Sequence, residues 1–408
     1  MLYRVEVENF YSIRDHQVLD LSIAPNVPDP DNRYAPIFEG SSLRAPKVVA
    51  IFGKNASGKT NFLKAMEFIF NLVRAPQPQQ GWPTFIERFN DAEAKSRPVK
   101  FAVELGGAMN LSAEVLARID RGQEVQWGTY RYEVELEVAD GFIARIQHEA
   151  LRQKPDGRGK WQRVFERDHE GKIKDSPTFS LRGFQHLLNT LGPMVSVLAS
   201  FAHFQHPAAQ RFVEVARQGL FQGTNTPQFA NDSIILNHLS TRPHEVARLN
   251  KELSRIDVGV EGVRFAETGQ GPQIMFKHSG LQVEMPWQLE SHGTQKFIKV
   301  YPLIANALAT GGVVAIDELD NAIHPAVLPE ITRWFYSSER NPNNAQLWIT
   351  CHAVSMLDDL NKEEVVICDK DRQGRTSFYP LMEVKVRRDD NLYRKYLSGA
   401  LGGVPHIG

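Results

Sequence analysis

The fold of this 408-residue chain is decided by the stretch VVAIF-GKNASGKT at residues 48–60. Its first five residues are all apolar, which is typical of a strand that is covered on both faces in a parallel sheet. Its last eight residues fit the pattern G-x-x-x-x-G-K-[ST] at every fixed position, and apolar residues at helical spacing follow over residues 60–74. A glycine-rich loop between a buried strand and a helix predicts a phosphate-binding loop.

This loop predicts a nucleotide site that is built largely from backbone. Its glycines let amide groups close around phosphate oxygens, and the first turn of the helix adds its positive dipole end. We expect Lys59 to reach the β- and γ-phosphates of ATP and the Thr60 hydroxyl to bind Mg²⁺. The nucleotide-binding set expected from the loop is Gly53, Lys54, Asn55, Ala56, Ser57, Gly58, Lys59, Thr60 and Asn61. The alternative, a glycine-rich turn that binds nothing, is disfavoured by the strand and helix on either side.

A second buried strand ends in two carboxylates, far from the loop in sequence. Residues 311–316 read GGVVAI and are followed by Asp317 and Glu318. Next to a phosphate loop, the first acid of such a pair holds Mg²⁺ and the second polarises the attacking water. We therefore expect Asp317 to support the metal and Glu318 to act as the general base. The alternative is a core strand that simply reaches the surface in charged residues.

Two further motifs narrow the class of phosphate-loop enzyme. Residues 289–295 (LESHGTQ) open an amphipathic helix, in which Ser291 fits the N-cap position. A serine side chain and the Gly293 amide at a helix N-terminus also suit the γ-phosphate of a nucleotide held by a second subunit. Residues 346–352 (QLWITCH) form another buried strand that ends in His352. Because parallel strands present active residues at their carboxyl ends, we expect His352 to lie beside the acidic pair and to contact the γ-phosphate.

The rest of the chain predicts an α/β protein with three parts. Residues 1–110 form an amino-terminal lobe with alternating strands at 2–8 and 17–21, a loop rich in Pro, Asp and Asn at 25–46, and the phosphate loop. Residues 111–280 form an inserted region, a β-meander followed by a largely helical part. Residues 281–408 alternate helix and strand, as in a parallel sheet, and form the carboxy-terminal lobe.

Composition limits the partners and the compartment. The chain has 47 basic and 48 acidic residues, so nucleic-acid binding, which needs a basic excess, must be local or supplied by a partner. Only two cysteines occur, which suits a reducing cytosol. The start lacks the apolar core of a signal peptide, and no apolar run is long enough to cross a bilayer. We expect a cytoplasmic protein without a membrane partner.

The motifs resemble those of the ABC-type ATPases of the OLD and SMC/Rad50-like group. The resemblance is carried by IDELDNAIHP at residues 316–325, followed by QLWITCH. Within the group, the chain is most similar to stand-alone bacterial AAA15-type ATPases, which often occur in abortive-infection and other phage-defence operons. Their starts resemble residues 7–13 (VENFYSI), and their ends resemble residues 387–393 (RRDDNLY) and 396–405 (YLSGALGGVP). The likeness covers both lobes and says little about the middle.

The resemblance implies an ABC-ATPase head with an inserted region, which forms a homodimer or a higher oligomer around ATP and Mg²⁺. Lys59 and Thr60 would bind phosphate and Mg²⁺, Asp317 would support the metal, and Glu318 would be the base. Ser291 and Gly293 would serve the ATP of the opposite subunit. The motif departs from transporter ATPases, which have glycines where this chain has His292 and Thr294. The glutamine that normally links nucleotide state to the inserted domain is not evident; the candidates are Gln147, Gln185 and Gln205.

The function implied by this likeness is that of a sensor or regulatory ATPase in a bacterial anti-phage complex. Its effector, nuclease-like or toxin-like, is expected to be a separate protein, because the sequence after His352 is short for a nuclease domain. The first alternative is a DNA-repair or recombination ATPase that clamps DNA, for which residues 152–174 are the densest basic stretch. The second is a scaffold that holds ATP with little turnover. A phosphate-release assay separates the scaffold from an enzyme.

Overall fold

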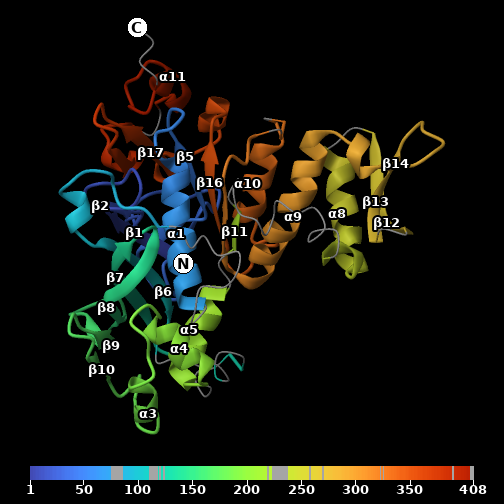
Figure 1. Cartoon of the computed structure of the whole chain (residues 1–408). Helices are drawn as coiled ribbons and strands as arrows, with labels where there is room; N and C mark the ends of the chain where they lie inside the picture. The colour runs from blue at the N-terminus through green and yellow to red at the C-terminus, as the bar shows by residue number, and fades with distance from the viewer. Residues whose placement is uncertain are drawn as a thin grey trace.

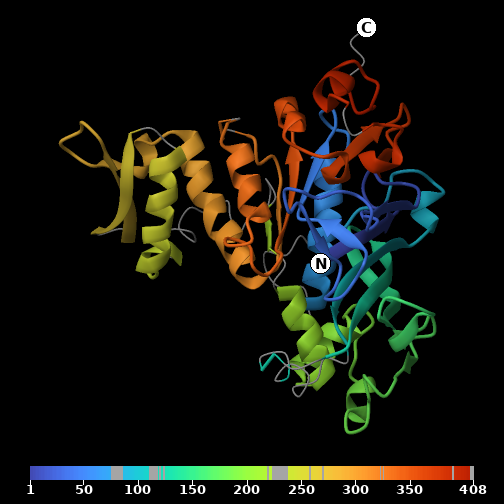
Figure 2. The ribbon, with the colours of Figure 1, turned by 180° about the vertical axis from the view of Figure 1, so that it is seen from behind.

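The computed structural model describes most of the chain. The described residues are 1–74, 86–109, 118, 121–122, 125–217, 220–222, 238–256, 259–268, 271–321, 323–324, 326–387 and 390–404. They form two large sheets with a long helix between them, two smaller sheets, and an arm that projects from one side (Figures 1 and 2).

The central sheet has six strands and carries the phosphate loop. Its spatial order is β11 (Leu220–Gln222), β15 (Val313–Ile316), β16 (Gln346–Cys351), β5 (Val48–Phe52), β17 (Val365–Lys370) and β18 (Thr376–Pro380). The first five strands run parallel, and β18 pairs antiparallel with β17. Strands β5, β15 and β16 are buried along their whole length; β5 and β15 are apolar throughout, as the sequence predicts, whereas β16 also buries Gln346 and Thr350.

The register of the central sheet brings its strand ends together. Phe52 pairs with Cys351, and Ile316 pairs with Ile349. The residues after these pairs, among them Gly53 and His352, therefore leave the sheet at one edge. Functional side chains of parallel sheets gather at this carboxyl edge, so the motifs that lie far apart in sequence meet there.

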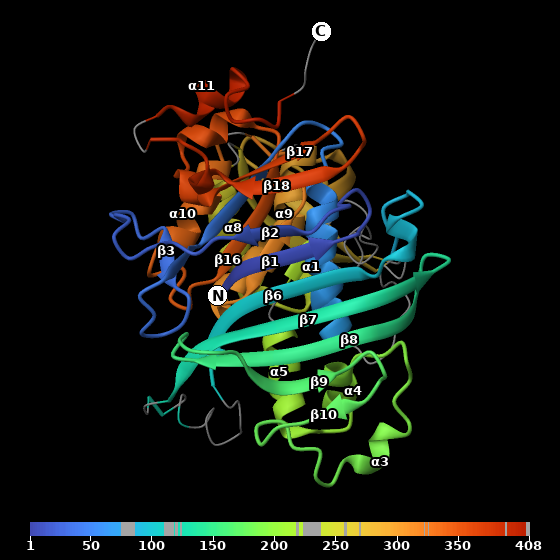
Figure 3. The same cartoon turned by 90° about the vertical axis from the view of Figure 1, so that its left-hand side faces the viewer.

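The second sheet is antiparallel and has seven strands (Figure 3). Its order is β10 (Ile173–Lys174), β9 (Gln162–Arg167), β8 (Phe142–Pro155), β7 (Trp127–Ala139), β6 (Val99–Ala108), β1 (Leu2–Glu8) and β2 (Gln17–Asp20). Since β6 pairs with β7 over ten residue pairs, from Val99–Leu136 to Ala108–Trp127, the meander of the expected inserted region continues the sheet that β1 begins.

One face of the antiparallel sheet is polar and the other is covered. On the polar face, charges pair across strands: the Arg131 guanidinium contacts the carboxylates of Glu6 at 2.7 Å and Glu104 at 2.9 Å. The covered face packs against α1 (Lys59–Arg74), which is the helix after the phosphate loop. In α1, Phe68 packs against Phe101 of this sheet, whereas Phe62 packs against Trp348 of the central sheet. Helix α1 is thus held between the two sheets.

The inserted region contains strands as well as helices. Its described helices are α3 (Gln185–Leu188), α4 (Val197–His203), α5 (Pro207–Arg217) and α8 (Pro243–Ile256). Helices α4 and α5 cover the end of α1, and the buried Glu149 carboxylate accepts hydrogen bonds from the Ser196 hydroxyl and the Val197 amide at the start of α4. Pro207 and Pro243 begin α5 and α8, as suits residues that lack an amide hydrogen.

The projecting arm consists of α8, α9 (His292–Thr310) and a small sheet of β12 (Val260–Thr268), β13 (Gly271–His278) and β14 (Met285–Pro286) (Figure 1). Helix α9 and α10 (Leu328–Tyr336) cover the other face of the central sheet. Helix α11 (Leu392–Leu397) lies near the carboxyl terminus.

Residues 25–46, expected as a loop, also hold the short pair β3 (Tyr34–Pro36) and β4 (Arg44–Pro46). The expected α/β head is confirmed. None of the helices in the described part of the chain is long and apolar enough to cross a membrane.

Candidate nucleotide site

The phosphate loop has the backbone shape that its glycines allow. Ala56 and Gly58 both have positive φ angles, of 60° and 112°. A β-carbon at Gly53 would lie 2.1 Å from the carbonyl oxygen of Cys368, and one at Gly58 would lie 2.3 Å from the Thr376 hydroxyl oxygen. Close packing therefore requires glycine at both positions, and the positive φ of the turn also requires it at Gly58.

The side chain of Lys59 lies across the inside of the loop. Its Nζ atom donates hydrogen bonds to the carbonyl oxygens of Gly53 at 2.6 Å and Lys54 at 3.2 Å. Burial lowers the pKa of Lys59, although the nearby carboxylates of Asp317 and Glu318 oppose this shift. Negatively charged phosphate oxygens are stronger acceptors for a desolvated ammonium than these two neutral carbonyls. The Lys59 ammonium could therefore exchange the carbonyls for phosphate.

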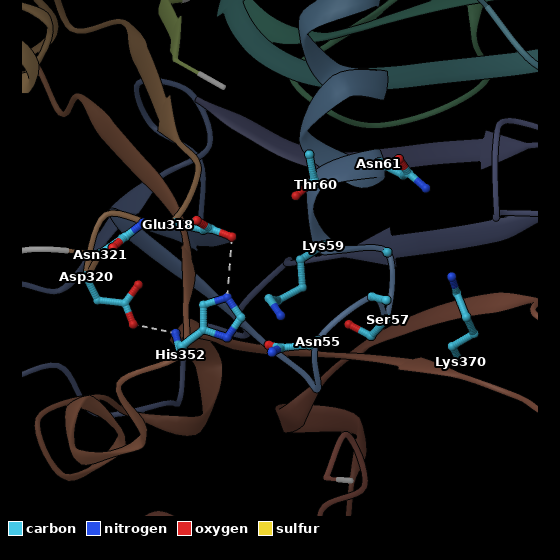
Figure 4. A pocket seen from close by; sticks show the side chains of 12 residues that line it. Asn55, Ser57, Lys59, Thr60, Asn61, Glu318, Asp320, Asn321, His352 and Lys370 are labelled. Atoms are coloured by element: carbon cyan, nitrogen blue, oxygen red, sulfur yellow. Dashed lines mark hydrogen bonds and ion pairs between the residues drawn. The ribbon is translucent and has the colours of Figure 1, made fainter. Parts of the chain in front are cut away.

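A cavity of about 690 Å³ opens beside the loop (Figure 4). Its lining consists of Asn55, Ala56, Ser57, Gly58, Lys59, Thr60, Asn61, Glu318, Asp320, Asn321, His352 and Lys370. The structure thus brings together the phosphate loop, the base expected at Glu318, and His352. Three strands supply these residues: β5, β15 and β16 each end at this cavity.

Asp317 is held by two threonine hydroxyls at the floor of the site. Thr60 donates to its Oδ2 atom at 2.9 Å, and Thr350 donates to its Oδ1 atom at 2.6 Å. The hydroxyl and carboxylate oxygens of Thr60 and Asp317 are hard ligands of the kind that Mg²⁺ prefers. The donor set expected for the metal therefore fits Mg²⁺.

Glu318 and His352 face each other across the cavity. The Nε2 atom of His352 lies 3.7 Å from the Oε1 atom of Glu318, and Asn321 donates to the Oε2 atom of Glu318 at 3.4 Å. Glu318 has a positive φ of 49°, which turns its side chain off the strand direction and is uncommon for a residue with a β-carbon. Both side chains are about one-third exposed, 33% for Glu318 and 39% for His352, so each is accessible from the cavity.

Sequence reasoning missed two residues that shape this site. Asp320 accepts hydrogen bonds from the backbone amides of His352 and Ala353, and so fixes the turn that carries the histidine. Lys370 lines the cavity from the end of β17. Asp320 could have been predicted as a site residue, because it follows Asp317 and Glu318 closely in sequence. No local sequence pattern predicts that Lys370 lines the cavity.

One buried polar atom in the loop fits an anion. The Ser57 hydroxyl oxygen has no hydrogen-bond partner among the described residues, although Ser57 is fully buried. Buried hydroxyls normally find a partner, and phosphate oxygens would supply acceptors here. The amide-rich loop, the Lys59 ammonium and this hydroxyl form a donor set that suits a polyphosphate.

Two members of the expected loop set also contact residues outside the loop. Lys54 contacts the Asp369 carboxylate and the carbonyl of Lys370, each at 3.0 Å. Asn61 lines the cavity, and its amide nitrogen donates to the Ser12 hydroxyl at 2.8 Å.

Ser291 and Gly293 lie on a different cavity, of about 790 Å³, between α8, α9 and the segment after the acidic pair. Ser291 is the N-cap of α9, and its hydroxyl accepts from the Thr294 amide at 3.1 Å. The N-cap expectation is confirmed. The two cavities share no lining residue, so within one chain Ser291 and Gly293 do not line the cavity of the phosphate loop.

The three candidate glutamines, Gln147, Gln185 and Gln205, do not line the nucleotide cavity. A fourth, Gln222, ends strand β11 and pairs with Ile316 in the parallel register. Its backbone therefore reaches the carboxyl edge of the sheet beside Asp317. Strand β11 is only three residues long, and no local pattern identifies it.

The family comparison agrees with this geometry. Residues 48–358 match the family described as "AAA domain, putative AbiEii toxin, Type IV TA system". No curated protein matches the sequence. Among solved structures, the crystal structure of an SMC head bound to the C-winged helix domain of ScpA is similar, with 14% identity and a TM-score of 0.44 over 92% of this chain and 96% of that chain. Because the family match spans most of the chain and includes the phosphate loop, the acidic pair and His352, the chain belongs to this family of AAA domains.

Proposed function

We propose that this protein binds and hydrolyses ATP with Mg²⁺, dimerises around the nucleotide, and acts as the sensor or regulatory subunit of an anti-phage complex. The observation that carries the proposal is the meeting of three strand ends in one cavity. The loop after β5, the acids after β15 and the histidine after β16 all line it or its floor. No single one of these motifs identifies an ATPase, but their convergence supports one.

Binding begins with the phosphate loop. Its amides and the amino end of α1 would surround the β-phosphate, and Lys59 would leave the carbonyls of Gly53 and Lys54 to contact the β- and γ-phosphates. The exchange replaces two neutral acceptors by charged ones, which strengthens each hydrogen bond.

Thr60 and Asp317 would hold Mg²⁺, Thr60 directly and Asp317 directly or through water. The ion would neutralise charge that develops on the phosphates during transfer. In the present arrangement, the Thr60 hydroxyl donates to Asp317. A metal ligand must present a lone pair to the ion. The observed bond already directs the Thr60 hydrogen toward Asp317, which would leave the oxygen lone pairs for the metal.

Glu318 would act as the general base toward the attacking water. Its Oε1 atom faces His352 and its Oε2 atom faces Asn321, so one side chain on each side restricts its orientation. His352 would contact the γ-phosphate and report its presence. Gln222 would be the glutamine that links this site to the inserted region, since its backbone lies in register with Ile316, the residue that precedes Asp317.

Dimerisation is supported by the separation of the two cavities. Ser291 and Gly293 sit at the start of a helix, where backbone amides suit an anion, but away from their own phosphate loop. A second copy of the chain, turned by a two-fold axis, would supply them to the nucleotide. The Ser291 hydroxyl bonds both the Thr294 amide at 3.1 Å and the Thr294 hydroxyl at 2.7 Å, so it would donate to a phosphate when the Thr294 hydroxyl is the donor between the two side chains.

The defence role rests on the family match and on the sequence likeness to AAA15-type proteins. Its effector, nuclease-like or toxin-like, would be a separate protein. The alternative of a DNA clamp is less favoured, because several basic side chains of residues 152–174 already contact partners within the chain. Arg152 contacts Glu133 at 3.0 Å, Lys174 contacts Asp168 at 3.1 Å, and Lys154 lies over the Trp161 ring.

The test is the variant Glu318→Gln, compared with Lys59→Ala. We expect Glu318→Gln to bind ATP normally and to lose about a hundredfold or more in phosphate release, the usual range for a general base. With Mg²⁺-ATP, Glu318→Gln should accumulate as a dimer, as measured by light scattering. Lys59→Ala should bind no ATP, and its oligomeric state should be the same with and without nucleotide. Normal turnover by Glu318→Gln would disprove the base assignment. Binding of ATP by wild-type protein without turnover would favour the scaffold, and salt-dependent DNA binding would favour the clamp.

A further inference from the structure

The carboxy-terminal segment packs directly against the start of the phosphate loop. A β-carbon at Gly403 would lie 2.9 Å from the Cγ2 atom of Ile367 and 3.5 Å, an ordinary van der Waals distance, from the Cα atom of Gly53. Gly53 is itself packed on its other side against the Cys368 carbonyl. The first residue of the loop is therefore enclosed between strand β17 and residues that lie 350 positions later in the chain.

Asp369 ties the two segments together. Its carboxylate contacts the Lys54 ammonium in the loop at 3.0 Å, and the Gly403 amide adds to the stabilisation of its ionised form. Burial raises the pKa of this carboxyl, but the Lys54 ammonium and the amides of Lys370 and Gly403 outweigh it, so the pKa is lowered. The ionised carboxylate is thus the form that this arrangement stabilises.

Two tyrosines hold the carboxy-terminal segment in place. The Tyr396 hydroxyl donates to the carbonyl of Gly403 at 2.9 Å, and its ring packs edge-on against Phe52, the residue before Gly53. The Tyr379 hydroxyl donates to the carbonyl of Leu401 at 2.8 Å. The segment is therefore anchored from β5, from β18 and from its own helix α11.

We propose that residues 396–404, acting through Asp369, position the phosphate loop, so that the affinity for ATP depends on this carboxy-terminal segment. This inference rests on the proposed function, because it assumes that the loop binds a nucleotide. The loop grips phosphate through backbone amides, which cannot adjust independently of the chain. A shift of the Gly53–Lys54 backbone therefore moves several hydrogen-bond donors at once. Small displacements of a binding group can lower affinity by a large factor.

The variant Gly403→Ala tests the packing of this segment against Ile367 of β17 and the start of the loop, and Gly374→Ala is its matched control. Both glycines have positive φ angles, 69° for Gly403 and 80° for Gly374, so alanine causes similar backbone strain at each. Only at Gly403 does the new methyl group meet other atoms, because nothing lies within 4 Å of a β-carbon at Gly374. The difference between the two variants therefore reports the packing on the loop.

The variant Asp369→Ala tests the link by a second route, with Asp371→Ala as its control. Asp371 lies in the same hairpin and pairs with Arg375 at 2.6 Å, but it has no described bond to the loop. This pair guards against misfolding of Gly403→Ala, since removal of an acid side chain introduces no clash.

The measurement is binding of ATP by titration calorimetry, together with steady-state hydrolysis and thermal unfolding. We expect Gly403→Ala and Asp369→Ala to weaken ATP binding by about tenfold, in keeping with a misplaced binding group. They should raise KM and leave kcat within about twofold, because Glu318 is untouched. A purely structural role would lower the unfolding temperature and the active fraction without raising KM.

The outcomes separate this inference from the proposed function. If wild-type protein binds ATP and both variants bind it as tightly as their controls, the positioning role is wrong and the ATPase assignment stands. If wild-type protein binds no ATP, the proposed function fails first.

Discussion

The hydroxyl of Thr350 donates a hydrogen bond of 2.6 Å to the Oδ1 atom of Asp317. The same hydroxyl accepts a hydrogen bond of 2.7 Å from the amide of Glu318. Thr350 is fully buried, so both bonds lie out of water, where such bonds are strong and their loss is costly. One threonine thus orients the expected metal ligand and the backbone of the expected base.

The variant Thr350→Val should weaken both folding and catalysis. It keeps the shape of the side chain but leaves a buried carboxylate oxygen and a buried amide without their partner, at a cost of about 1–3 kcal/mol in the free energy of unfolding. Turnover should fall by about tenfold or more, since Asp317 and Glu318 lose their orientation. Chemical denaturation and phosphate release measure the two effects. Thr350→Ser is the control, because it retains the hydroxyl, and a valine variant as active as the serine variant would contradict this account.

Thr60→Val should separate nucleotide binding from the requirement for metal. The loop amides and Lys59 remain, so ATP without Mg²⁺ should bind about as well as it does to the wild type. The advantage that Mg²⁺ gives to binding should shrink, because the hydroxyl ligand is lost. Titrations with and without Mg²⁺ measure this difference, and Thr60→Ser should restore it. An unchanged effect of Mg²⁺ would place the metal elsewhere.

Mixed dimers test whether Ser291 acts on the nucleotide of a second copy. Lys59→Ala and Ser291→Ala chains should each be inactive alone. Mixed together, they should regain activity, because a mixed dimer has one site with an intact loop and an intact opposite Ser291. Loss of the N-cap costs only about 1 kcal/mol, so the Ser291→Ala chain should still fold. If activity does not recover in a mixture that is shown to form mixed dimers, the shared site is wrong.

Glu67 should make stability depend on pH. Burial in α1 raises the pKa of this carboxyl to about 7, although Lys64 and Arg74 oppose the shift. The folded state then holds the proton more tightly than the unfolded state does. Stability from this group is complete below the ordinary pKa near 4.5, and it is lost as pH rises through about 7. The stability lost by the time the pH is above 7 should amount to roughly 3–4 kcal/mol at most, because the folded and ordinary pKa values, about 7 and 4.5, differ by about 2.5.

Glu67→Gln should remove this pH dependence. The variant should gain stability relative to the wild type at pH 8 and differ little from it at pH 4. Denaturation curves at the two pH values provide the measurement. Parallel pH profiles for the two proteins would show that Glu67 titrates normally.

The sequence predicted which segments meet at the cavity beside the phosphate loop, because each part has a local signal. A buried strand such as Val48–Phe52 is apolar throughout, and the loop, the acids or the histidine come directly after such a strand. Parallel pairing then brings these ends to one edge without further information. The positions of Lys59, Glu318 and His352 on one cavity agree with that reasoning.

Other features depend on contacts between distant segments and could not be predicted. The three residues of β11 become a strand only by pairing with β15, so Gln222 carried no periodic signal. The β3–β4 pair lies in a segment whose prolines and aspartates indicate a loop, and only three residue pairs hold it. Gly403 resembles an ordinary turn glycine until its neighbour Gly53 is known.

Helix α9 begins at the Ser291 cap and ends at Gly311, two residues before the strand that leads to Asp317 and Glu318. Its 19 residues, with Pro302 inside the helix, span about 28 Å. In a two-fold dimer, the end that grips the neighbour's ATP would therefore be joined, without a flexible linker, to the acids that cleave the chain's own ATP. In each subunit, helix α9 would then couple the contact with the neighbour's ATP to the hydrolysis of the subunit's own ATP. The timing of the two hydrolysis events would therefore depend on the same helix.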